Sequence, residues 1–115
     1  MDPVRLAIVG SRYFPYPWMV EQYLRRKSFD ELVSGGAKGV DTWAAIYAKR
    51  QSRDFKVFPA DWEAHGKMAG FLRNHDIVDY ATDVVAFWYG ESRGTAHTIK
   101  LAREAGKLRE VIHVY

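Results

Sequence analysis

The 115-residue sequence contains no cysteine and no apolar stretch that approaches the roughly 20 residues needed to cross a bilayer. The lack of cysteine excludes disulfide bonds and thiolate metal sites, and it is compatible with a reducing compartment. Residues 1–5 lack the basic stretch and following apolar run that mark a signal peptide. We therefore expect a cytoplasmic protein without a membrane partner.

The sequence also has little net charge, because its 17 lysines and arginines are nearly balanced by 14 aspartates and glutamates, which gives a formal net charge of +3. This weak excess favours anionic ligands but falls short of the basic patches typical of nucleic-acid-binding proteins. The hydrophobic share of 48% and the charged share of 27% are typical of a globular chain. The length suits one domain, so we expect residues 1–115 to form a single ligand-binding domain.

Short apolar runs alternate with amphipathic segments along the whole chain. The predicted strands span 6–9, 31–33, 55–58, 83–88 and 111–114. The predicted helices begin at Pro17 or span 41–50, about 66–80 and about 94–105, with Phe71, Leu72, Ile77 and Val78 facing inward. This alternation predicts an α/β fold, a three-layer Rossmann-like sandwich around a five-stranded parallel sheet. We expect the strand order 3-2-1-4-5, because it places the first and fourth turns together at the switch point.

Three of the predicted strand-to-helix turns are rich in glycine and hydrogen-bond donors. Ligands of open parallel sheets bind beyond the carboxyl ends of the strands, where glycine lets backbone amides approach an anion. Any one such turn also suits a simple structural role, but three at one edge, two with arginine, favour a phosphate site. The candidate ligand-binding residues in these turns are Gly10, Ser11, Arg12, Gly35, Gly36, Ala37, Gly39, Asp41, Gly90, Ser92, Arg93, Gly94 and Thr95.

The turn after the third strand differs, because it carries Asp61 and Trp62. Trp62 suits stacking on a base, with Asp61 accepting from ribose or base donors; alternatively, Trp62 covers the core and Asp61 caps a helical turn. Arg73 and Asn74, in the following helix, are further candidates, as is His97 beside the last glycine-rich turn. The histidines show no metal-binding spacing, so we expect no metal site.

Four segments of the sequence together resemble one known superfamily. Residues 10–12 (GSR), residues 34–41 (SGGAKGVD), the segment from Ala60 to Asn74 and residues 88–97 (WYGESRGTAH) are similar to motifs of SLOG proteins. The match is best to a small YpsA-related branch found in bacteria and phages. SLOG proteins include the LOG phosphoribohydrolases and the DNA-processing protein DprA, and the resemblance implies a Rossmann-like domain that binds nucleotides or nucleotide-derived molecules.

The resemblance leaves the chemistry open. LOG enzymes use an arginine, matched by Arg73, and a glutamate three residues after a Gly-Thr pair, where this chain has Thr98. Threonine has no carboxylate to stabilise a ribosyl cation or activate water. We therefore favour binding or sensing of a nucleotide-derived small molecule, such as an NAD-like, ADP-ribose-like or nucleoside phosphate ligand.

One alternative is an N-glycosidic hydrolase of nucleoside monophosphates, with Arg73, His97 and Asp61 as catalytic candidates. Another is DprA-like binding of single-stranded DNA. The aromatic content of 15% is hard to bury in one small core, and dimers are common in the superfamily, so a homodimer or higher homo-oligomer is a further expectation.

Overall fold

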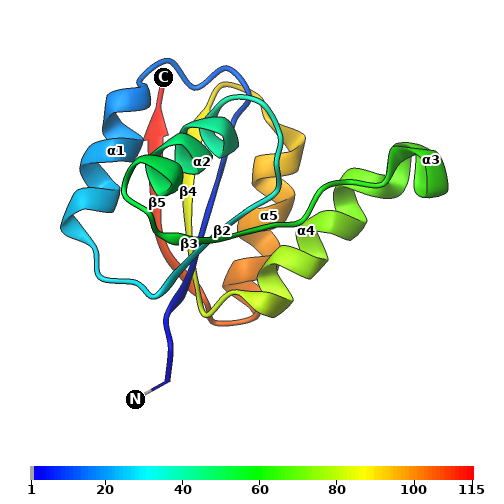
Figure 1. Cartoon of the computed structure of the whole chain (residues 1–115). Coiled ribbons are helices and arrows are strands. Elements are labelled where there is room, and N and C mark those ends of the chain that lie inside the picture. Colours follow the sequence, from blue (N-terminus) through cyan, green and yellow to red (C-terminus); the bar gives the residue numbers. More distant parts are fainter. Residues whose placement is uncertain (1) are drawn as a thin grey trace.

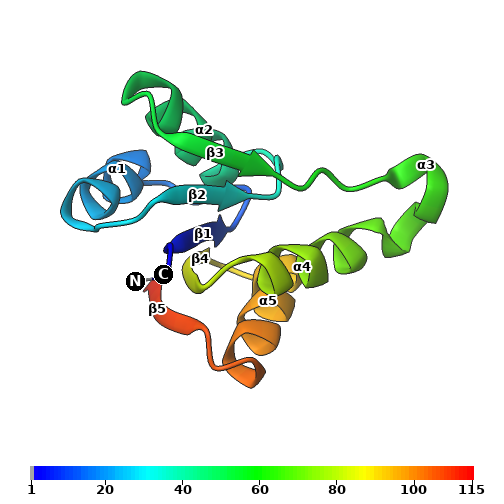
Figure 2. The same ribbon diagram turned by 60° about the horizontal axis from the view of Figure 1, so that its bottom comes forward.

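The computed structural model describes residues 2–115 and contains one five-stranded, fully parallel sheet in the order β3-β2-β1-β4-β5 (Figure 2). Its strands are β1 (Arg5–Gly10), β2 (Glu31–Ser34), β3 (Asp54–Val57), β4 (Asp83–Tyr89) and β5 (Leu108–Val114). Its helices are α1 (Pro17–Arg26), α2 (Val40–Arg50), α3 (Trp62–His65), the 3₁₀ turn η1 (Gly66–Met68), α4 (Ala69–Tyr80) and α5 (Arg93–Glu104). The predicted α/β fold, parallel pairing and strand order are confirmed.

Helices cover both faces of the sheet, with α1 and α2 on one side and α4 and α5 on the other (Figures 1 and 2). Alternate residues of β1 divide between these layers, because successive side chains of a strand point to opposite faces. Leu6 and Ile8 pack with the α1–α2 layer, whereas Ala7 and Val9 pack with the α4–α5 layer. The central strands β1 and β4 are therefore continuous apolar runs, as expected for strands covered on both faces.

Helix ends follow the local sequence signals. Pro17 occupies the first turn of α1, where its missing amide has no intrahelical partner to lose. Gly106 follows the last residues of α5 with a φ of +70°, a conformation that favours glycine. The strand β5 begins at Leu108, three residues before the predicted start, because the exposed Arg109 and Glu110 interrupt its apolar run.

The segment between β3 and α4 is the main departure from the predicted elements. The short helix α3 is the helical turn capped by Asp61 that was the alternative for this segment, and the predicted helix 66–80 begins as the turn η1. With the start of α4 these elements form an arm that projects from the body (Figures 1 and 2). The expectation that Phe71 and Leu72 face inward was wrong, because they lie on this arm, 39% and 40% exposed. Ile77 and Val78, farther along α4, are buried as expected.

The parallel arrangement brings the carboxyl ends of the strands to one edge. Gly10 at the end of β1 pairs with Phe87 of β4, and the Ser11 amide donates to the Phe87 carbonyl at 3.0 Å. A Cβ on Gly10 would lie 2.5 Å from that carbonyl oxygen, so only glycine allows β1 and β4 to approach here. Among residues 2–115, no helix is both long and apolar enough to cross a membrane.

Candidate functional site

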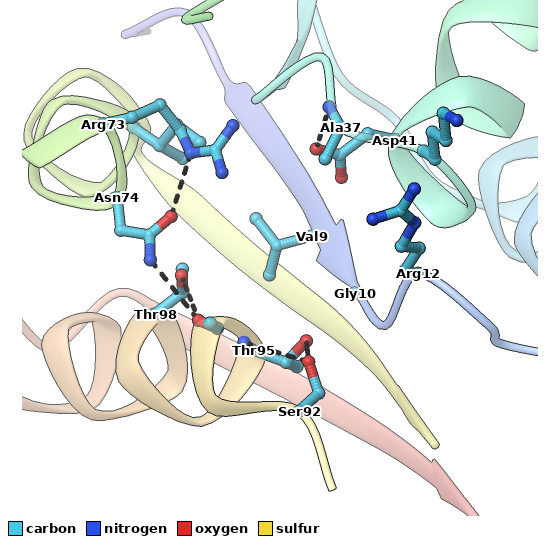
Figure 3. Close-up of a pocket in the computed structure, with 13 residues that line it drawn as sticks. Val9, Gly10, Arg12, Ala37, Asp41, Arg73, Asn74, Ser92, Thr95 and Thr98 are labelled. Atoms are coloured by element: carbon cyan, nitrogen blue, oxygen red, sulfur yellow. Dashed lines mark hydrogen bonds between the residues drawn. The ribbon is translucent and has the colours of Figure 1, made fainter. Parts of the chain in front are cut away.

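A cavity of about 180 Å³ opens at the carboxyl edge of the sheet, between β1, α2, α4 and α5 (Figure 3). Three strand-to-helix turns meet there, as the order 3-2-1-4-5 predicts. Gly10 and Gly94, from the first and fourth of the predicted turns, both line this central cavity. Its other wall residues are Val9, Arg12, Ala37, Lys38, Asp41, Arg73, Asn74, Ile77, Ser92, Thr95 and Thr98.

The amino terminus of α5 forms part of the wall of the central cavity, through Ser92, Gly94 and Thr95. Ser92 is the N-cap, and its hydroxyl accepts from the Thr95 amide at 3.4 Å and lies 2.7 Å from the Thr95 hydroxyl. Within residues 2–115, no acceptor engages the amides of Arg93 and Gly94. A Cβ added to Gly94 would meet nothing within 4 Å, so this end of the helix is open. Free amides and the positive end of the helix dipole suit an anion.

Arg73 and Asn74 connect three elements around the cavity. The Arg73 Nη1 donates to the Gly35 carbonyl at 2.6 Å, and its Nε donates to Asn74 Oδ1 at 3.1 Å. Asn74 Nδ2 in turn donates to the Gly94 carbonyl at 3.4 Å. Together these bonds hold the β2–α2 turn, α4 and the start of α5 in register. Figure 3 shows the two that involve Asn74. Nη2 of Arg73 has no partner in the described chain, so it is available to a ligand.

His97 lies behind this network rather than in the central cavity. Its Nδ1 is 3.2 Å from Asn74 Nδ2, and its ring packs against Phe71 and His75, with centroid separations of 4.8 and 5.4 Å. Burial lowers the pKa of His97, and the neighbouring charges of His75 and Lys100 lower it further. A neutral imidazole can accept from Asn74, so His97 supports the orientation of that amide.

Asp41 is the buried acidic group of the cavity, only 6% exposed. Its Oδ2 accepts from the Ala37 amide at 3.1 Å, which fixes the β2–α2 turn (Figure 3). Burial raises the pKa of Asp41 to about 6, although the Ala37 amide and the charge of Arg73 act in the opposite direction. Asp41 therefore acts mainly as a support for the turn; it is largely ionised at neutral pH and becomes protonated as the pH falls through about 6.

The raised pKa of Asp41 predicts a pH-dependent contribution to stability. Below its unfolded value of 3.8 this contribution is fully present, and it is lost as the pH rises through about 6. Between about pH 4 and pH 8 we expect the wild type to lose on the order of 2 kcal/mol of unfolding free energy relative to Asp41→Asn. Urea unfolding at both pH values measures this change. A pH-independent difference between the two proteins would contradict the raised pKa.

Two more cavities extend the central one toward the arm. The first, of about 340 Å³, shares Arg12, Ala37, Lys38 and Arg73 with it. The second, of about 210 Å³, shares Arg73, Asn74 and Gly94. Trp62 lines both added cavities and is 59% exposed. We call these three connected cavities the cleft; Arg73 lines all of them.

The structure separates the predicted site residues into two groups. Those that line the cleft are Gly10, Arg12, Gly35, Gly36, Ala37, Asp41, Trp62, Arg73, Asn74, Ser92, Gly94 and Thr95. Those outside its lining are Ser11, Gly39, Asp61, Gly90, Arg93 and His97. Two residues of the second group have clear structural roles. The Ser11 hydroxyl accepts from the Tyr89 amide at 2.9 Å, and Asp61 caps α3 by accepting from Ala64 at 3.0 Å.

Sequence reasoning missed Lys38 and Thr98 as cleft residues. Lys38 lies within a glycine-rich turn that was singled out, and its charge was the available signal. Thr98 lies four residues after Gly94, so the helical repeat places both on one face of α5. Its hydroxyl donates to the Gly94 carbonyl at 3.0 Å. Across residues 2–115, no group of three or more His, Asp or Glu side chains is arranged to hold a metal ion.

Comparisons with known proteins agree with this architecture. The gene 61 protein of Mycobacterium phage D29 is 44% identical over 113 residues, covering 89% of this chain and 90% of that protein. The structure is also similar to DNA processing protein A from Helicobacter pylori, which was studied for its single-stranded DNA binding mode, with a TM-score of 0.70. That likeness covers 94% of this chain but 65% of the other, at 19% identity, so it shows the shared fold alone.

A family model matches the first half of the chain. It is described as the YspA, cpYpsA-related SLOG family, and it covers residues 5–65, which include β1, β2, β3 and two of the three cleft-forming turns. The match spans more than half of the chain, which assigns the family. The chain belongs to the YspA, cpYpsA-related SLOG family.

Proposed function

We propose that this protein binds a nucleotide-derived small molecule in the cleft, with a phosphate at the amino terminus of α5. The observation that carries the proposal is the pair of unpartnered amides of Arg93 and Gly94 at the open end of α5, beside Ser92 and Thr95. The guanidinium of Arg12 lines the same cavity, and it adds a charge-assisted donor for a phosphate. Donors from two different turns thus converge on one place.

The rest of the cleft fits the other parts of a nucleotide. Arg73, at the junction of the three cavities, offers its free Nη2 to a second phosphate or to a ribose hydroxyl. Trp62 offers an exposed aromatic face in the adjoining cavity, where a base can stack. A ligand with a phosphate at one end and a ring at the other would occupy both the central cavity and the adjoining cavity lined by Trp62. The cleft also contains three cations, Arg12, Lys38 and Arg73, whose charge matches a pyrophosphate-bridged molecule such as ADP-ribose.

The side chains in and near the cleft favour binding of the ligand without its hydrolysis. Asp41 is the sole carboxylate among the described residues of the central cavity, and it is engaged with the Ala37 amide. Thr98 replaces the LOG glutamate and donates its hydroxyl to the backbone. Asp61 caps α3 and lies outside the cleft lining. None of these groups is placed as a free general base beside a glycosidic bond.

Calorimetric titration with AMP, ADP-ribose, ribose 5-phosphate and adenosine tests the proposal. We expect the three phosphate-bearing compounds to bind and adenosine to bind far more weakly, because it lacks the anion. Equal affinities for AMP and adenosine would contradict the phosphate site. Release of free adenine during incubation would instead assign N-glycosidic hydrolysis. A steep salt dependence with an oligodeoxynucleotide, and no binding of the small molecules, would assign single-stranded DNA binding.

Removing the Trp62 ring tests binding of the base separately from binding of the phosphate. We expect Trp62→Ala to lower the affinity for AMP by roughly tenfold, because base–aromatic stacking contributes about 1–3 kcal/mol per base. The affinity for ribose 5-phosphate should stay unchanged, since that ligand has no base. Trp18→Ala is the matched control, because Trp18 is equally exposed at 57% but lies on α1, away from the cleft. An equal loss of ribose 5-phosphate binding in Trp62→Ala would contradict the stacking role.

A further inference from the structure

The helices α1 and α2 lie on the opposite side of the sheet from α4 and α5 (Figure 1). A second concave surface lies between the exposed sides of α1 and α2. This groove has a volume of about 360 Å³, larger than the central cavity of the cleft. Pro17, Trp18 and Glu21 of α1 line one wall, and Trp43, Ile46 and Arg50 of α2 line the other. We call it the α1–α2 groove. It shares no lining residue with the cleft.

Large apolar side chains are left in water along this groove. Trp18 is 57% exposed and Ile46 is 44% exposed, and Tyr16 packs beside Trp18 with ring centroids 6.1 Å apart. A contiguous apolar patch with a polar rim is the pattern of a protein–protein interface rather than of a free surface. Tryptophan is also the residue type that most often dominates such interfaces. The same patch thus contains both a protruding ring and a groove that can receive one.

The two walls carry opposite charges. Glu21 lies on the α1 wall, where its Oε1 pairs with Arg25 at 2.9 Å and its other oxygen has no partner among the described residues. Arg50 lies exposed on the α2 wall and makes no ion pair within residues 2–115. If two copies meet through this face about a two-fold axis that runs along the groove, the α1 wall of each meets the α2 wall of the other. Each Glu21 then faces an arginine of opposite charge, twice in the assembly. An axis across the groove would instead bring like walls, and therefore like charges, together.

We propose that a second copy of this chain docks on the α1–α2 groove, forming a symmetric dimer in which Trp18 enters the partner's groove and Glu21 pairs with the partner's Arg50. Self-complementarity favours this occupant, because one surface supplies the protruding ring, the receiving groove and both charges. A different partner would need its own matching set of all three. The cleft stays open in this arrangement, since its residues lie outside the groove.

Charge reversal provides a sharp test. By analytical ultracentrifugation we expect the wild type to be a dimer at micromolar concentration, and Glu21→Arg and Arg50→Glu to dissociate at least roughly tenfold more readily, because like charges then face each other twice. Mixing the two single variants should restore a dimer containing one of each, since arginines on one chain then meet glutamates on the other. The double variant Glu21→Arg/Arg50→Glu should dimerise alone for the same reason.

The remaining outcomes overturn the proposal. A monomeric wild type would do so, and so would single variants that dimerise like the wild type, because the interface would then lie elsewhere. Monomeric single variants that fail to associate when mixed would show that the charges do not face each other. Arg103→Glu, a charge reversal on α5, is the matched control and should remain a dimer. AMP titration of the single variants should match the wild type, because the groove and the cleft share no residue. A failure of the dimer proposal can therefore be distinguished from a failure of the proposed nucleotide site.

Discussion

Replacing Gly94 with leucine should lower the affinity for AMP or ADP-ribose by roughly 100-fold or more, a loss of about 2.7 kcal/mol. Gly94 has no side chain at the open amino terminus of α5, so a phosphate can approach the amides of Arg93 and Gly94 closely. A leucine side chain would cover these amides. The free energy of unfolding should not fall, because an added Cβ meets nothing within 4 Å and leucine favours a helix more than glycine does.

The matched control is Arg93→Leu, one residue earlier in the same helical turn. Arg93 is exposed and lies outside the cleft lining, so this variant removes a nearby charge without covering the amides. We expect its affinity to fall only a few-fold, through the weaker field. Calorimetric titration and urea unfolding of both variants separate affinity from stability. If Gly94→Leu binds AMP like the parent, the phosphate lies elsewhere and the first turn of α5 is a structural turn.

The layers of the fold could be predicted because the apolar pattern of each strand and helix lies within one short segment of the sequence. Continuous apolar runs mark β1 and β4, the two strands buried on both faces, and the switch-point rule then orders the sheet. The arm could not be predicted in this way. Phe71 and Leu72 have the helical spacing of inward residues, yet α4 begins beyond the sheet, so both stay exposed even though the Phe71 ring packs against His97. Periodicity gives the apolar side of a helix, but not how far the helix extends past its support.

The candidate site was predicted at the level of its turns and less well at the level of single residues. The rule that ligands bind at the carboxyl edge selects a turn, but every tight strand-to-helix turn also needs glycine for its own path. Gly94 opens on empty space, whereas Gly10 is packed against the backbone of β4. Asp61 similarly follows a strand, yet its carboxylate turns back to cap α3. The free space around a glycine and the direction of a side chain decide these roles, and the spacing of residues along the sequence indicates neither.

Gly39 shows how a glycine in a predicted binding turn acts through packing, and its replacement carries the largest expected loss of stability. Its φ of +84° and ψ of −123° lie in a region that side-chain-bearing residues rarely adopt. A Cβ at this position would also overlap the carbonyl group of Arg12, which belongs to the backbone and cannot rotate away as a side chain could. We therefore expect Gly39→Ala to lower the free energy of unfolding by roughly 4 kcal/mol, the combined cost of strain and overpacking.

Gly90→Ala is the matched control for this prediction. Gly90 also has a positive φ, of +60°, but an added Cβ there meets nothing within 4 Å, so only the backbone strain remains, about 1 kcal/mol. Urea unfolding of both variants measures the difference between them, which contains the overlap with Arg12 and the greater backbone strain at Gly39. Because Gly39 presses on the turn that carries Arg12 into the cleft, Gly39→Ala should also weaken AMP binding in whatever fraction remains folded. Equal stability losses in the two variants would mean that the β1–α1 and β2–α2 turns are not in contact, and that Arg12 reaches the cleft without this support.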